Sequence, residues 1–444
     1  MTRLPRLRAG RRPPGLAALA LSGVCAGLLV HGAQAQEAGR ELNIGTSLGV
    51  QANDNLNLDS DSEGSTTSAT AGFDFALLLA NIGQSFALSG DFQLRSSNGP
   101  DEDAVSDGLS SADLRLRYNR ESRDARFGVN GFLSRREVAL IEPLDIVDLL
   151  DPDGDGVPNL DDPLVLDDLD VATQRGTRLS FGLDTTLELR RTAPFGIILS
   201  AGLSGLRYDD SSTGGLEDEN RHRAGIGLRF DLNPVTQARL DLDYSSYEQD
   251  NDDEGRRDTF VLSLDLNRAT QAGSIGLVTE AVSTEDGERF TLGLERSLDL
   301  PLWTLTGQIG ATRTEGGDVL PTGRLSASRD LRQGALSLDL TREVRSGSDD
   351  EERRVTGLSL DYSRPLTPLT SMGLDLSYLR SDATGDNDET ESFGRAAIEL
   401  NRTLSEDWSL SVSLAHRIED NGFADRAHDN RISFDLRRQV TFRP

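Results

Sequence analysis

The residues best suited to binding a ligand lie in one acidic segment, 151–162, which reads DPDGDGVPNLDD. Carboxylates occupy its first, third, fifth and twelfth positions, and a glycine occupies the sixth. A calcium loop needs this spacing, because alternate residues converge on one ion and glycine permits the sharp turn between them. The expected ligands are the side chains of Asp151, Asp153, Asp155 and Asp162, the carbonyl of Val157, and Asn159 directly or through water.

Two interpretations of this segment stay open. It is not an EF-hand, because Pro158 lies inside it, no helical pattern flanks it, and Asp162 is shorter than the usual final glutamate. It resembles a single thrombospondin type 3 repeat, although this copy is alone and has no cysteine. The resemblance implies a structural calcium ion, and the alternative is a solvated acidic turn.

Enzymatic chemistry finds little support in the chain. A hydrolytic site would need a histidine paired with serine or aspartate, and after residue 35 the sequence offers only His222, His416 and His428. His416 lies on the apolar side of an alternating segment, where a catalytic residue is not expected. We interpret the adjacency of His428 and Asp429 as incidental and not as a catalytic pair. There is no phosphate loop, dinucleotide fingerprint or zinc pattern, so we expect no enzyme.

The segments on either side of the acidic segment, and most of the remaining chain, are predicted to be strands. Segments of about ten residues alternate apolar and polar side chains, as in LSLDL at 336–340, LSLDY at 358–362 and LDLSY at 374–378. Successive side chains of a strand point to opposite faces, so each segment has one apolar and one polar face. Nothing else in the chain could cover the apolar faces, so lipid outside and water inside a closed sheet is the consistent solution.

The alternation and the turn signals predict an all-β fold, a single transmembrane antiparallel up-and-down barrel of about 20 strands, within a range of roughly 18 to 22. The strands are expected near 41–51, 67–79, 84–95, 109–119, 125–135, 175–189, 196–208, 221–232, 237–247, 258–268, 273–283, 288–299, 302–313, 321–330, 334–344, 353–364, 370–380, 391–402, 407–418 and 429–442.

The predicted connections alternate in length. Short turns such as 81–83, 233–236 and 403–406 alternate with longer acidic connections such as 52–66 and 381–391. Outer-membrane barrels have short periplasmic turns and long outer loops, and an even strand count places both termini in the periplasm. The longest connection, about 136–174, is the third outer loop, and it holds the candidate calcium ligands.

The beginning of the chain predicts export. Five arginines precede an apolar run at 16–30, which leads to Ala33-Gln34-Ala35. This pattern is typical of a secretory signal peptide, so we expect residues 1–35 to be removed and residues 36–444 to form the barrel. The only cysteine, Cys25, would leave with it, and the remaining chain could form no disulfide.

The charge excludes one class of partner. The formal net charge is −28, with 74 acidic residues against 46 basic ones, and such acidity repels nucleic acid. The mean hydropathy is −0.41, which a membrane barrel permits because only every second strand residue touches lipid.

The polar face of the strands is expected to line the lumen with mixed charges. Two readings are open: a network that satisfies itself between strands, and an electrostatic lining that sets selectivity. The expected lining residues are Asp113, Arg115, Arg117, Asp241, Asp243, Asp265, Asp339, Asp361, Asp375, Glu399, Asp435 and Arg437.

Arginines often follow the acidic connections, where the chain enters the next strand. They could pair with the carboxylates of those connections, or they could form a ring that contacts lipid phosphates at the outer interface. The residues are Arg221, Arg223, Arg256, Arg257, Arg289, Arg353, Arg354 and Arg431.

The last strand supports a family resemblance. Ile432, Phe434, Leu436, Val440 and Phe442 share one face, like the C-terminal recognition strand of outer-membrane barrels, although Arg443-Pro444 follow it. With its hairpin layout and the polar pairs that enter its short turns, at 267–268, 363–364 and 401–402, the chain resembles the porin-like barrels of Gram-negative bacteria. It is closest in style to the beta-barrel porins, some of which accompany exopolysaccharide export.

The resemblance implies a location in the outer membrane. The partners it implies are outer-membrane lipid and lipopolysaccharide, the barrel assembly machinery, and components of polysaccharide export. The first hypothesis for function is a passive diffusion porin or an export-linked pore. The second is a structural or adhesive surface barrel with a calcium-bound outer loop and no open pore. The solute and the oligomeric state are left open.

Overall fold

A computed structural model describes residues 39–56, 58, 62, 64–100, 107–138, 176–209, 218–249, 256–285, 287–346, 352–384, 390–420 and 426–443. The regular elements are twenty strands: β1 (Gly39–Asn53), β2 (Thr66–Asn81), β3 (Gln84–Asn98), β4 (Gly108–Glu121), β5 (Ala125–Glu137), β6 (Thr177–Leu189), β7 (Phe195–Asp209), β8 (Glu219–Asn233), β9 (Thr236–Gln249), β10 (Arg256–Thr270), β11 (Gly273–Ser283), β12 (Glu288–Leu300), β13 (Trp303–Arg313), β14 (Val319–Leu331), β15 (Gly334–Ser346), β16 (Glu352–Thr367), β17 (Thr370–Ala383), β18 (Thr390–Thr403), β19 (Trp408–Asp420) and β20 (Ala427–Phe442).

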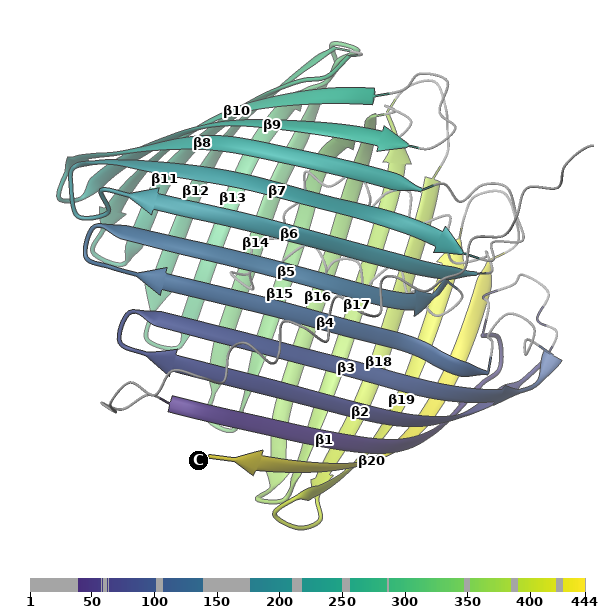
Figure 1. Cartoon of the computed structure of the whole chain (residues 1–444). Coiled ribbons are helices and arrows are strands. Elements are labelled where there is room, and N and C mark those ends of the chain that lie inside the picture. The colour runs from purple at the N-terminus through teal and green to yellow at the C-terminus, as the bar shows by residue number, and fades with distance from the viewer. Residues whose placement is uncertain are drawn as a thin grey trace, which may run out of the picture. The chain divides into compact units, whose positions relative to one another are not determined.

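Every strand pairs antiparallel with its neighbours in the chain, and the sheet closes on itself. β1 pairs with β2 on one side and with β20 on the other, in a register from Leu42–Phe442 to Asn53–Arg431. Figure 1 shows β1, in purple, beside β20, which carries the C-terminal label. The predicted fold, a single antiparallel up-and-down barrel of about twenty strands, is confirmed.

The alternation of side chains explains why these segments become strands. On β10, Phe260, Leu262 and Leu264 are about half exposed on the outer face, while Ser263 and Asp265 between them face inward. A period of two residues fits a pleated strand and would place apolar residues all round a helix. None of the described residues forms a helix long and apolar enough to cross a membrane.

The connections separate the two ends of the barrel. At the short-connection end, strands are joined by two to five residues; at the long-connection end, four to thirty-nine residues separate them. β1 begins and β20 ends at the short-connection end. The turn between β2 and β3 uses Gly83 at a φ of 82°, which a side chain would disfavour.

Most strands extend beyond their predicted limits at the long-connection end. β3 continues to Asn98 rather than residue 95, and β7 to Asp209 rather than 208. Hydrogen bonding between strands therefore continues past the apolar stretches that define the pattern. At the opposite end β16 runs through Pro365 to Thr367, with a register irregularity between these two residues.

The barrel has no large hydrophobic interior among its described residues. The one cluster of buried apolar side chains consists of Val355, Leu379 and Phe393, on the inner faces of β16, β17 and β18. Large apolar side chains instead remain on the outside, with Leu48, Leu294 and Ile309 at 64%, 56% and 74% exposure. Such a surface is unfavourable in water and suits contact with lipid.

Candidate channel lumen

The inner face of the barrel is polar, as the alternation predicts. All twelve expected lining residues fall on the inward parity, because each is paired through the sheet with other inward residues and offset by one from exposed apolar side chains. Asp265, for example, lies opposite Arg239, between the outward Leu264 and Leu266. The strand register therefore places a continuous polar wall where a water-filled passage requires one.

Three aspartates form one row across adjacent strands of this wall. Asp91 of β3 lies directly opposite Asp74 of β2 and Asp113 of β4. Arginines contact the two outer members: Arg437 Nη2 lies 2.9 Å from Asp74 Oδ2, and Arg136 Nη2 lies 3.6 Å from Asp113 Oδ2. The middle carboxylate is exposed on the inner face. Like charges directly opposite one another repel, so this row favours cations in the adjacent water.

A hollow of about 620 Å³ lies in the inner wall of β14 to β20. Its acidic residues are Asp330, Asp361, Asp375, Glu399 and Asp435, and Arg395 Nε lies 3.8 Å from Asp375 Oδ1. Asp361 and Asp375 are direct cross-strand partners. The surrounding hydroxyls include Ser433, which donates to Asp435 Oδ2 at 3.3 Å. This hydrophilic wall carries more negative than positive charge.

Most of the arginines at the starts of strands face the lumen, which bears on the two alternatives for their role. Arg221, Arg289 and their equivalents Arg223, Arg257, Arg353 and Arg431 lie on the inward parity; of the eight, only Arg256 and Arg354 face outward. The hypothesis of a ring on lipid phosphates at this end is therefore wrong for the inward set. Parity alone could have shown this, because Arg289 is offset by one from the exposed Phe290.

Inward arginines pair with carboxylates of nearby strands. Arg223 Nη2 of β8 lies 3.0 Å from Asp184 Oδ1 of β6. Arg353 Nη2 of β16 lies 3.5 Å from Glu391 Oε1 of β18, and its Nε donates to Ser381 Oγ at 2.9 Å. The charges at the long-connection end of the lumen are thus largely compensated within the wall.

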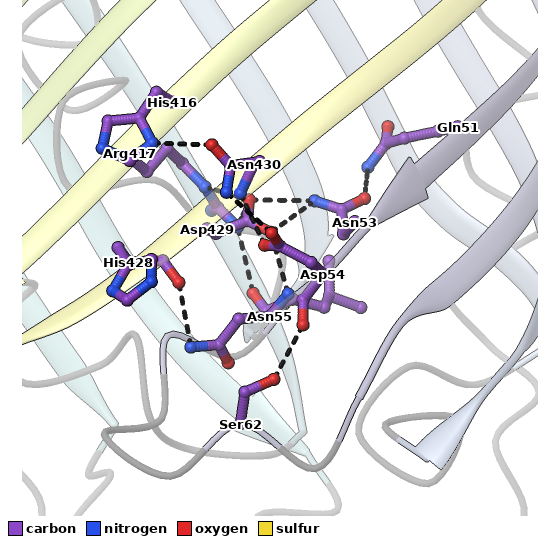
Figure 2. A network of polar contacts seen from close by, with 11 residues as sticks. Gln51, Asn53, Asp54, Asn55, Ser62, His416, Arg417, His428, Asp429 and Asn430 are labelled. Carbon is purple, nitrogen blue, oxygen red and sulfur yellow. Dashed lines mark hydrogen bonds and ion pairs between the residues drawn. The ribbon is translucent and has the colours of Figure 1, made fainter.

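Sequence reasoning missed a polar network at the seam where β1 meets β20 (Figure 2). Its centre is Asp429, whose side chain is fully buried and accepts from Arg417 Nη2 at 2.7 Å. The same carboxylate accepts from Asn53 Nδ2 at 3.1 Å and from the backbone N–H of Asn55 at 3.1 Å. Arg417 also donates to the carbonyl of Leu56 at 3.1 Å, so the chain leaving β1 is bound to the two last strands.

A second layer of this network lies nearer the solvent. Asn430 donates through its backbone N–H to Asp54 Oδ1 at 2.6 Å and through Nδ2 to Asp54 Oδ2 at 2.7 Å. Burial acts to raise the pKa of Asp54, but the hydrogen bonds from Asn430 and the nearby His428 outweigh it, so this pKa lies below the ordinary aspartate value. Asp54 is therefore held as a carboxylate.

His416 and His428 both form hydrogen bonds within this network. His416 Nδ1 lies 2.8 Å from Asn430 Oδ1, and the His416 and His428 rings lie 6.4 Å apart. The carboxylate of Asp429 is engaged by Arg417, Asn53 and Asn55 and does not orient the neighbouring histidine.

The predicted calcium ligands Asp151, Asp153, Asp155, Val157, Asn159 and Asp162 lie outside the described residues. The structure places the ends of their connection, since Val138 N donates to the carbonyl of Gly176 at 2.9 Å and joins the exit of β5 to the entry of β6. In the described part of the chain, no group of three or more acidic, histidine or cysteine side chains is arranged to hold a metal ion.

Comparison with known proteins supports the fold. No family model matches the chain, and no curated protein matches its sequence. The structure is similar to that of the siderophore receptor PirA from Acinetobacter baumannii, at 8% identity and a TM-score of 0.51, over 91% of this chain and 81% of that one. It also matches OccAB4 from Acinetobacter baumannii, at 11% identity and a TM-score of 0.39, over 92% of this chain and 99% of that one. At such low identity the likeness to the receptor shows the fold alone, which is a closed antiparallel barrel.

Proposed function

We propose that this protein is a passive diffusion channel of a bacterial outer membrane, for small hydrophilic solutes and with a preference for cations. The observation that carries the proposal is the division of one closed sheet into an apolar outer face and a charged inner face. Only lipid outside and water inside satisfy both faces at once. A soluble barrel would bury its apolar face, and this one leaves Leu294 and Ile309 more than half exposed.

The preference for cations is expected from the carboxylates of the middle of the lumen. The inward arginines near the long-connection end are engaged by carboxylates, as in the pair of Arg223 and Asp184. Deeper in the barrel, the row around Asp91 and the hollow around Asp361 carry more carboxylates than arginines. Fixed charges that line a passage set the sign of the ion that enters most readily.

The orientation follows from the lengths of the connections. Outer-membrane barrels keep short turns in the periplasm and long loops outside. By this rule the short-connection end, where β1 begins and β20 ends, faces the periplasm. The acidic long connections then face the medium, and the candidate calcium segment at 151–162 belongs to that side.

A swelling assay tests passive diffusion. Purified protein is reconstituted into liposomes, which are then diluted into iso-osmotic solutions of uncharged sugars of increasing size. We expect the swelling rate to fall steadily with sugar size and to rise linearly with concentration, because a passive pore has no saturable site. Saturation at low concentration would instead support a specific transporter, and no swelling by verified folded barrels would support the structural or adhesive barrel.

A further inference from the structure

The outer face carries a set of arginines at the short-connection end that the proposed channel does not use. Seven even-numbered strands each place one outward arginine within their last five residues, and β1 adds one at its start. We name this set the arginine collar; it consists of Arg40, Arg120, Arg268, Arg296, Arg329, Arg364, Arg402 and Arg438. The collar repeats with the hairpins, which gives it a regular spacing around much of the barrel.

The register places the collar on the outside. Arg268 lies opposite Ile275, an outward side chain with 48% exposure. Arg402 lies opposite Leu410 in the same way. The neighbouring inward positions are polar and include Asn267 and Asn401. The collar guanidinium groups therefore start from the lipid-facing side of the sheet.

No carboxylate of a strand faces outward beside the collar. The acidic strand residues at that end, such as Asp299, Asp330 and Glu399, have the inward parity. Within the described residues, Arg40, Arg120, Arg268, Arg364 and Arg402 form no ion pair with a carboxylate. The acidic contact of the collar in the described chain is a distant one, 4.0 Å from Arg438 Nη2 to Asp407 Oδ2 in a turn.

The opposite end of the outer face is different. Several of its outward arginines are neutralised by carboxylates on the same face: Arg256 Nε lies 2.8 Å from Asp258, and Arg380 Nη2 lies 2.7 Å from Asp382. Arg354 Nη2 also contacts Asp382, at 3.0 Å. Arg135, Arg313 and Arg342 also face outward toward this end and form no ion pair with a carboxylate among the described residues. Uncompensated outward arginines are therefore more numerous at the collar, although they are not confined to it.

Aromatic side chains mark the level of the collar as a membrane interface. The guanidinium of Arg329 lies 4.8 Å from the ring centre of Trp303, and that of Arg438 lies 5.8 Å from the ring centre of Trp408. Tryptophan prefers the level of the lipid headgroups, and arginine extends its charged end to the same level from an apolar stem. Guanidinium groups at this depth meet phosphates, which they can bind through two parallel hydrogen bonds.

We propose that the arginine collar binds the headgroups of anionic phospholipids in the leaflet at the short-connection end. The inference rests on the membrane placement of the proposed function. The net charge of −28 would repel such lipids from the protein as a whole. The acidic connections lie at the other end of strands that are roughly 33 Å long for ten residues, which is several times the Debye length at physiological salt. The local positive charge therefore decides which lipid is enriched.

Lipid selection by spin-labelled probes tests the proposal. The full protein is reconstituted in phosphatidylcholine with trace amounts of spin-labelled phosphatidylglycerol or phosphatidylcholine, and the motionally restricted fraction of each probe is measured. We expect a several-fold preference for phosphatidylglycerol that weakens at high salt. The triple variant Arg268→Gln, Arg364→Gln, Arg402→Gln should lose most of that preference.

A matched variant at the other end provides the control. Arg256→Gln, Arg354→Gln, Arg380→Gln removes as many outward arginines and should keep the preference. Equal restriction of both probes by the unaltered protein, or equal loss in both triple variants, would overturn the proposal. Displacement of the lipid probe by millimolar inorganic phosphate at constant ionic strength would also overturn it, because the site would then be for free anions.

The channel and the collar fail separately. Conductance in pure phosphatidylcholine bilayers should be unchanged in the collar variant, since its substitutions lie outside the lumen. If the unaltered protein does not conduct, the proposed channel is rejected, and the measured preference for phosphatidylglycerol still stands. Heat-modified mobility in gels verifies that each variant is a folded barrel before either measurement.

Discussion

Arg417 and Asp429 are direct cross-strand partners on β19 and β20, and they form an ion pair of 2.7 Å in which the aspartate is fully buried. The pair holds the chain that leaves β1 through Asn55 and Leu56. These contacts join residues separated by more than 360 positions in the sequence, at the one place where the first and last strands meet. The seam is thus held by side-chain hydrogen bonds and an ion pair in addition to its backbone hydrogen bonds. We call this network of Asn53, Asp54, Asn55, Arg417, Asp429 and Asn430 the clasp.

Removing one member of this pair should destabilise the seam strongly. Arg417→Met leaves the buried Asp429 carboxylate without its cation, and such a loss costs about 3 to 5 kcal/mol. We expect a lower midpoint of urea unfolding in detergent, followed by tryptophan fluorescence. Arg426→Met is the matched control, because Arg426 pairs with Asp420 on the exposed rim, with 68% of its side chain accessible. If the two variants unfold at the same midpoint, the clasp contributes little.

The outer layer of the clasp should respond to acid. The pKa of Asp54 is lower in the folded protein than in the unfolded chain, where it is about 3.9. The Asp54 carboxylate therefore stabilises the folded state above that pH, and this contribution is lost as the pH falls through the lower folded value. We expect the protection factor of the Asn430 amide, which donates to Asp54, to fall below about pH 4. Asp54→Asn should remove this pH dependence; an unchanged pH profile in that variant would exclude Asp54 as its source.

The segment at 151–162 should bind calcium weakly. Its four candidate carboxylate ligands repel one another unless a divalent ion neutralises them, and extracellular calcium sites have dissociation constants of roughly 10⁻⁴ to 10⁻³ M. We expect calcium to protect the segment from protease, and Asp153→Ala with Asp155→Ala to abolish the protection. The barrel itself should stay folded in chelator. If calorimetry shows no calcium binding even at calcium concentrations well above that range, the segment is a solvated acidic turn.

Epitope tags should distinguish the two ends of the barrel. We expect tags inserted in 384–389 or 421–426 to be reached by antibody on intact cells, because long connections face outward in this class of barrel. A tag between Thr367 and Thr370 should be reached only after the outer membrane is permeabilised. Equal labelling of both sets on intact cells would contradict the topology.

The sequence predicts the strands and their faces well for a physical reason. A period of two both defines a strand and assigns each side chain to a face, so Asp113 and Asp241 could be placed in the lumen before the register was known. The count of strands follows from the regular turns. Parity also assigns Arg221 and Arg289 to the lumen, so the sequence alone is enough to exclude them from a ring of arginines on lipid phosphates.

The clasp could not be predicted in the same way. Asn53, Asp54 and Asp429 come from opposite ends of the chain, and nothing in the local pattern of either end identifies the other as its partner. Their contact depends on the closure of the sheet and on the exact pairing of β1 with β20. The carboxylate of Asp429 is held by Arg417, which agrees with the interpretation of its adjacency to His428 as incidental.

The most direct test of the channel is the reversal potential of single barrels in a planar bilayer of phosphatidylcholine, with a tenfold gradient of potassium chloride. We expect stable conductance steps and a reversal potential of the sign that cation selectivity produces. The triple variant Asp361→Asn, Asp375→Asn, Asp435→Asn neutralises the hollow in the wall and should shift the reversal potential toward zero while the barrel stays folded. Folded barrels that do not conduct, or that select anions, would contradict a cation-preferring diffusion channel.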